Sequence, residues 1–129
     1  MTQEQKELLL KDLCGRLPHG VKCQVQEDEF TYIGTLCRIE VDGKNGNLLD
    51  FAESISGLDC QVYLSEVKPY LFPLSSMTEE QLLELSSISF ENSIDSSIKT
   101  LNWCYKNHLD INNLIPMGLA NNATGLNIY

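Results

Sequence analysis

FTYIGTLCRIEV, residues 30–41, is the stretch of sequence that decides the fold. Its β-branched and aromatic residues favour an extended backbone. In such a strand apolar side chains would point to both faces: Ile33, Cys37, Ile39 and Val41 to one, and Phe30, Tyr32 and Leu36 to the other. We therefore predict a long strand, either central in a sheet or bent, with Gly34 marking a bulge or a bend.

Shorter strand patterns lie on both sides of this stretch. Before it, apolar and polar residues alternate over 21–26, which predicts a half-buried strand followed by a turn at 26–29. After it, DGKNGN at 42–47 predicts a tight connection. Residues 48–55 fit both a helix and a strand, and the alternation over 58–64 predicts another strand. Pro69 and Pro73 indicate an edge strand or an extended connector between them.

Sequence patterns that predict helices lie in both the N-terminal and the C-terminal parts of the chain. Thr2 and Gln5 form a capping box that predicts a helix over about 3–16, and Thr78 and Gln81 form another that predicts a helix ending near residues 86–87. A third helix should begin after Asn92 or Ser93, and 110–115 should form a short helical turn. The last residues, 121–129, carry little pattern and are a candidate for a loose tail.

The third helix carries an apolar stripe and a tryptophan on opposite faces. The stripe consists of Ile94, Ile98, Leu101 and Tyr105, whereas Trp103 points away from it. One interpretation is a helix sandwiched between layers, with Trp103 packed on the C-terminal tail. The other is that Trp103 is an exposed anchor of a protein interface. We favour packing.

These elements predict one α+β domain over residues 1–129. A small antiparallel sheet would be flanked by an N-terminal helix and two C-terminal helices, and a strongly bent sheet approaching a small barrel is the alternative form of that sheet. The apolar share of 43% and charged share of 21% are typical of a chain that can fill a core.

The charge and the ends of the chain limit its setting. Nine basic and eighteen acidic residues give a net charge of −9, which opposes direct binding to nucleic acid and to anionic lipid. Residues 1–6 lack the pattern of a secretion signal, and no apolar run approaches membrane-spanning length. We expect a cytoplasmic protein whose five cysteines stay as thiols, most of them in the core.

Motifs for catalysis and cofactor binding are missing from the sequence. Cys14, His19 and Cys23 are the best metal-ligand candidates, but no CxxC or HxxxH pair accompanies them, so we expect neither a metal nor another cofactor. The sequence contains no P-loop, dinucleotide fingerprint, GxSxG or HExxH motif and indicates no catalytic residue. His108 has a structural explanation, since a positive charge near the end of a helix complements its dipole.

Several strings resemble small uncharacterised proteins of phages and prophages of Bacteroides-type gut anaerobes. They are LKDLC at 10–14, RLP at 16–18, KPYL at 68–71, PLSSMTEE at 73–80, HLD at 108–110 and LIPMGLA at 114–120. The resemblance implies a bacterial or phage cytoplasmic setting and an accessory role. It brings no known activity and no catalytic residue.

Three functional hypotheses follow from these observations. The first is a non-enzymatic accessory protein of a phage or mobile element that binds another protein, with Trp103 as its interaction residue. The alternative is an acidic inhibitor or regulator of a nucleic-acid-binding protein, which Glu27, Asp28 and Glu29 would contact. The third is a small enzyme with a dispersed site. The sequence leaves the partner and the oligomeric state open.

Overall fold

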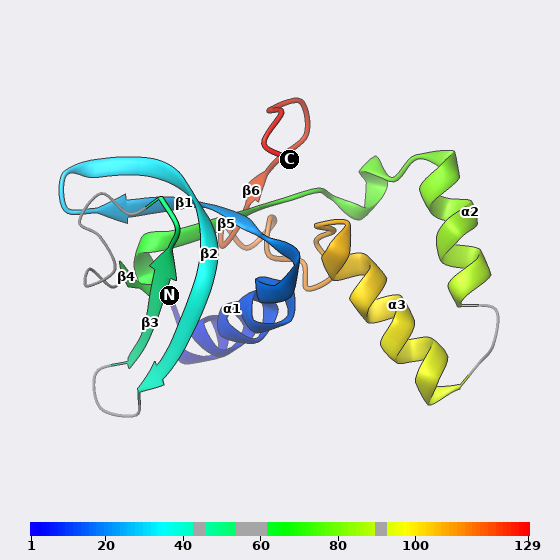
Figure 1. Ribbon diagram of the computed structural model, residues 1–129, viewed down its shortest axis with the longest axis horizontal. Helices are drawn as coiled ribbons and strands as arrows, with labels where there is room; N and C mark the ends of the chain where they lie inside the picture. The colour runs from blue at the N-terminus through cyan, green and yellow to red at the C-terminus, as the bar shows by residue number, and fades with distance from the viewer. Residues whose placement is uncertain (43–45, 54–61, 90–92) are drawn as a thin grey trace.

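The computed structural model describes residues 1–42, 46–53, 62–89 and 93–129. It has the predicted α+β class: an open six-stranded sheet with α1 (Gln3–Arg16) at the N-terminal side and α2 (Glu79–Ile88) and α3 (Ile94–Lys106) toward the C-terminus (Figure 1). The sheet order is β4-β3-β2-β1-β5-β6. Its strands are β1 (Lys22–Glu27), β2 (Phe30–Asp42), β3 (Gly46–Phe51), β4 (Val62–Tyr63), β5 (Val67–Leu71) and β6 (Asn121–Asn122). All neighbours are antiparallel except β5 and β6.

The long strand β2 joins the two halves of the sheet. Its first half pairs with β1 and its second half with β3, and Figure 1 shows it as one curved ribbon. The register shifts between Leu36 and Arg38, so the irregularity expected at Gly34 lies at Cys37. Gly34 serves a different purpose, because a Cβ there would come within 3.0 Å of the Phe51 side chain. The predicted bend therefore coincides with the bulge at Cys37, near the position where Gly34 packs closely against Phe51.

Other strand predictions need adjustment. The segment left open at 48–55 begins as strand β3, whereas Leu64–Glu66 is a 3-10 helix and not a strand. The expected strand residues Leu58 and Cys60 lie outside the described residues. Pro69 lies in β5, inside the sheet, but β6 pairs only from Tyr70 onward. Pro69 therefore has a strand neighbour on one side only, a position where proline is tolerated.

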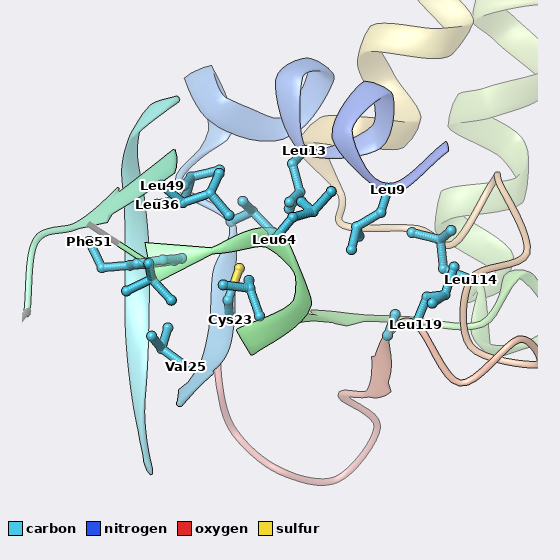
Figure 2. Close-up of a cluster of buried hydrophobic side chains, with 14 of the residues drawn as sticks. Leu9, Leu13, Cys23, Val25, Leu36, Leu49, Phe51, Leu64, Leu114 and Leu119 are labelled. Carbon is cyan, nitrogen blue, oxygen red and sulfur yellow. The ribbon is translucent and has the colours of Figure 1, made fainter. Parts of the chain in front are cut away.

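The core lies between the sheet and α1. Figure 2 shows Leu9 and Leu13 of α1 above Cys23 of β1, with Leu36 and Leu49 of the sheet to their left. Leu114 and Leu119, from the segment after α3, close one end of this cluster. Both predicted capping boxes are present, at Thr2 and Thr78, and Ser93 caps α3. Burying one large apolar side chain stabilises a fold by about 2 kcal/mol, so this cluster is the main source of stability.

An ion pair is buried within this core. Arg16 Nε donates to Asp12 Oδ2 at 2.6 Å, and Arg16 Nη2 donates to Asp12 Oδ1 at 2.9 Å. The same Nη2 donates to Leu109 O at 2.6 Å, and Asn112 Nδ2 donates to Asp12 Oδ1 at 2.8 Å. Both charged side chains are fully buried, so this network fastens the segment after α3 to α1.

The helices α2 and α3 form a hairpin that projects away from the sheet (Figure 1). The chain leaves the body of the protein, which consists of the sheet and α1, after β5, and it returns to the body at Leu109. At this base Phe72 N donates to His108 O at 2.8 Å, and Asp110 N donates to Phe72 O at 2.9 Å. The contact of α3 with α1 is close, since a Cβ at Gly15 would come within 2.3 Å of the Tyr105 ring. The hairpin is thus fixed to the body at its base.

Candidate interaction surface

The four described thiols differ in their exposure to solvent. Cys23 and Cys104 are buried, while Cys14 and Cys37 are exposed, so the expectation of cysteines mostly in the core holds for only half of the described ones. Burial raises the pKa of all four thiols. Among the described residues, no group of three or more His, Cys, Asp or Glu side chains could hold a metal ion.

His108 ends α3 in an unusual backbone conformation. Its φ is +57°, and Leu109 N donates to Cys104 O while His108 N donates to Tyr105 O, the hydrogen bonds of a Schellman motif. Glycine is the usual residue at this position. Burial lowers the pKa of His108 to about 4, so the imidazole is neutral at pH 7 and does not supply the positive charge expected at the helix end.

The Tyr129 side chain covers the His108 ring. The two rings stack with centroids 3.6 Å apart. Tyr129 Oη donates to Tyr70 O at 2.8 Å and accepts from Lys22 N at 3.0 Å. The last residue of the candidate loose tail therefore contacts the sheet and the end of α3. Beside His108 lies a cleft of about 400 Å³ whose lining includes Phe72, Thr78, Gln81 of α2 and Lys106 of α3. Thr78 and Gln81 already bond to each other, as the capping box of α2.

The acidic turn is only partly at the surface. Glu27 is 4% exposed, and Tyr32 Oη donates to its Oε2 at 2.8 Å. Asp28 has a φ of +53° and is exposed, as is Glu29. Of the three carboxylates proposed to meet a basic protein, the structure thus places two where a partner could contact them.

Trp103 lies inside the hairpin. It is 7% exposed and belongs to a small cluster with Cys104 and Leu109, against which Leu85 and Ile88 of α2 pack. The packing that we favoured is thus present, but the partner of Trp103 is α2. Trp103 stabilises the hairpin from within, and its burial leaves the other face of α3 to solvent.

That other face is the predicted apolar stripe of α3. The exposed fractions are 82% for Ile94, 54% for Ile98 and 44% for Leu101, whereas Tyr105 is buried against α1. On α2 no residue is fully buried, and Leu83 is 73% exposed. The stripe is therefore not the core-facing side of α3, contrary to what such a pattern indicates in a globular protein.

A groove of about 450 Å³ runs along one side of the hairpin. It is lined by Ser89, the residue that caps the end of α2, by Ile111, and by five residues of α3: Ser96, Ser97, Thr100, Leu101 and Cys104. On α3 the lining residues 97, 101 and 104 repeat at spacings of four and three. Such rows form the ridges that pack against another helix.

The hydroxyl groups along the groove already have partners in their own hairpin. Ser89 donates to Leu85 O, and Ser96 donates to Ile88 O. Ser97 donates to Ser93 O, and Thr100 donates to Ser96 O. Because these donors are used by the backbone, the groove presents a largely apolar surface.

Charge gathers on the opposite face of the hairpin. Helical periodicity places Lys99 and Lys106 of α3 on that face together with Glu84 of α2, and Lys99 Nζ lies 3.1 Å from Asp95 Oδ2. The hairpin is thus amphipathic, with a charged face and a groove face.

This surface was only partly visible in the sequence. The sequence identified the stripe residues. It did not show that they are exposed, because exposure depends on which face of α3 packs against α2. The described helices include none that is both long enough and apolar enough to span a membrane. Comparison of the chain with protein-family models, with curated proteins and with solved structures finds no match.

Proposed function

We propose that this chain is a non-enzymatic accessory protein that binds another protein through the exposed apolar stripe of α3 and the groove beside it. The observation that carries the proposal is the exposure of Ile94, Ile98 and Leu101 on a helix whose opposite face is buried. Contiguous apolar surface of this kind is expensive to leave in water and is typical of interaction sites.

The remaining chemistry supports a binding role over catalysis. Among the described residues, the imidazole beside the cleft has a pKa of about 4, which makes it a weak base at neutral pH. The buried Asp12–Arg16 pair is used to join α1 to Leu109 and Asn112. The resemblance of the sequence to phage and prophage proteins supports a bacterial cytoplasmic setting for this role.

A pair of matched variants tests the proposal. Leu101→Asp places a charge in the groove, whereas Asn102→Asp places the same charge on the next residue of the same helix, outside the groove. Tagged wild-type protein and both variants would be used to capture partners from a Bacteroides-type lysate treated with nuclease. We expect one protein to be recovered with the wild type and Asn102→Asp and lost with Leu101→Asp.

Two results would contradict the proposal. Equal recovery of every captured protein by the three forms would mean that the groove is not the interface. A partner lost on nuclease treatment would mean that nucleic acid bridges the two proteins. Circular dichroism of both variants must first show unchanged helix content, so that loss of binding is not loss of folding.

A further inference from the structure

We infer that a notch between β1, β5 and the end of α3 is a binding site for a tyrosyl side chain, filled in this structure by the chain's own Tyr129. The notch is formed by the backbone of Lys22 and Tyr70 and by the rings of Phe72 and His108. It takes a tyrosine of another molecule when Tyr129 is displaced. None of these residues lines the groove beside α3, so the notch is separate from the surface of the proposed function.

The floor of the notch is a gap in the pairing of β1 with β5. The paired residues are Val25 with Val67, Gln24 with Lys68, and Cys23 with Pro69. In the same register Lys22 would come next and pair directly with Tyr70. The Tyr129 hydroxyl lies between them instead, since Lys22 N donates to Tyr129 Oη at 3.0 Å and Tyr129 Oη donates to Tyr70 O at 2.8 Å. The hydroxyl therefore satisfies one donor and one acceptor that the missing strand pair leaves open.

Two aromatic rings form the walls of the notch. The His108 ring stacks on the Tyr129 ring at an interplanar angle of 11°, and the centroid of the Phe72 ring lies 5.9 Å from that of Tyr129. The φ of +57° at His108 is a left-handed conformation that residues with a Cβ rarely adopt, and strained backbone of this kind clusters at binding sites. The walls accept a flat ring and the floor accepts a hydroxyl, which together are the chemistry of tyrosine.

Tyr129 enters the notch from a largely exposed loop, residues 124–129. The loop turns back toward the sheet at Gly125 and Asn127, which both have a left-handed backbone. Tyr129 itself is 43% exposed. Burial raises the pKa of its hydroxyl, so the group stays protonated and donates at neutral pH. A side chain held in this way on an exposed loop can leave its site by local opening, without unfolding of the core.

Two amino-acid amides test the inference on the full chain. N-acetyltyrosine amide and N-acetylphenylalanine amide differ only in the hydroxyl, and each is titrated into the variant Tyr129→Ala, whose notch is open. Binding is followed by the backbone amide signal of Lys22 in two-dimensional NMR spectra, because this N–H donates into the notch. We expect the tyrosine amide to bind at least about tenfold more tightly, because the phenylalanine amide leaves the Lys22 N–H and the Tyr70 carbonyl unpaired.

The wild type and a matched variant serve as controls. In the wild type Tyr129 competes from its short loop at an effective concentration of about millimolar, so the tyrosine amide should bind at least about tenfold more weakly than to Tyr129→Ala. Tyr63→Ala also removes an exposed tyrosine, since Tyr63 is 48% exposed, but this residue lies on β4, at an edge of the sheet away from the notch. Tyr63→Ala should bind the tyrosine amide as the wild type does.

A second variant tests the floor of the notch even if Tyr129→Ala does not fold. Tyr129→Phe keeps the stacked ring and loses only the hydroxyl. Hydrogen exchange of the Lys22 amide should then be at least about tenfold faster than in the wild type, because its acceptor is gone. The Leu36 amide, which donates to Val21 O in the same part of the sheet, should exchange at the wild-type rate.

Four results would overturn the inference. Equal binding of the two amides to Tyr129→Ala would show that the notch does not recognise the hydroxyl. No binding of the tyrosine amide to that variant would show that the site closes when Tyr129 is removed. Equal binding to the wild type, Tyr63→Ala and Tyr129→Ala would place the ligand elsewhere. Unchanged exchange of the Lys22 amide in Tyr129→Phe would show that the hydroxyl is not its acceptor.

Discussion

The body and the hairpin use apolar residues in opposite ways. In the body, Leu9 and Leu13 of α1 are fully buried under the sheet, and the surrounding cluster is continuous from β3 to Leu119 (Figure 2). In the hairpin, α2 buries no residue fully and α3 leaves three large apolar residues exposed. Helices in proteins owe most of their stability to packing of their apolar face. Among the described residues, α1 therefore gains more stability from packing within the chain than α2 and α3 do.

The largest expected effect lies in the body, at the buried ion pair. Asp12→Ala leaves the Arg16 guanidinium buried without its carboxylate, and we expect it to lower the free energy of unfolding by about 3–5 kcal/mol. In the hairpin, Asp95→Ala breaks an exposed pair with Lys99 and should cost less than about 1 kcal/mol. Urea unfolding measures both. Similar losses of unfolding free energy in the two variants would contradict the expected difference between the buried and the exposed ion pair.

Two leucine variants extend the comparison from ion pairs to apolar side chains. Leu13→Ala removes a fully buried side chain of α1 and should cost about 2–5 kcal/mol. Leu83→Ala removes an exposed side chain of α2, and the change should stay within about 0.5 kcal/mol because alanine is also a good helix former. A large loss in Leu83→Ala, measured by the same unfolding assay, would show that the hairpin surface packs within the chain.

A smaller effect is expected where the hairpin rejoins the body. At His108 the positive φ strains any residue that carries a Cβ. His108→Gly and His108→Ala both lose the stacking with Tyr129, but only alanine keeps the strain. We expect the glycine variant to be more stable than the alanine variant by about 1 kcal/mol in thermal unfolding. Equal stability would mean that the backbone relaxes at this position.

The same histidine should make stability depend on pH. Burial lowers its pKa in the folded protein to about 4 from the ordinary value of 6.5, so between these values the unfolded chain binds a proton that the folded chain does not. Its contribution is therefore complete above pH 6.5 and is lost as the pH falls toward 4. His108→Gln should flatten the curve of unfolding free energy in this window. An unchanged curve would show that His108 is not buried as described.

Local signals predicted more of the fold than of the surface. Capping boxes act over three residues, so Thr2 and Thr78 could be located from the sequence alone. The β-branched and aromatic residues of 30–41 likewise predicted the long strand β2. The buried face of α1 was harder, because Asp12 and Arg16 read as surface residues until Leu109 and Asn112 are brought to them. For α3 the periodicity gave two faces, and only the packing of Leu85 and Ile88 on Trp103 decided which one is exposed.

The most direct test of the account is the stability of a variant in which Ile94 and Ile98 are both replaced by serine. If these side chains are free for a partner, as their exposure indicates, the free energy of unfolding should change by less than about 1 kcal/mol, because serine and isoleucine have similar helix propensities. A loss of about 4 kcal/mol or more, the cost of truncating two buried isoleucines, would contradict the account by showing that the stripe is part of the chain's own core.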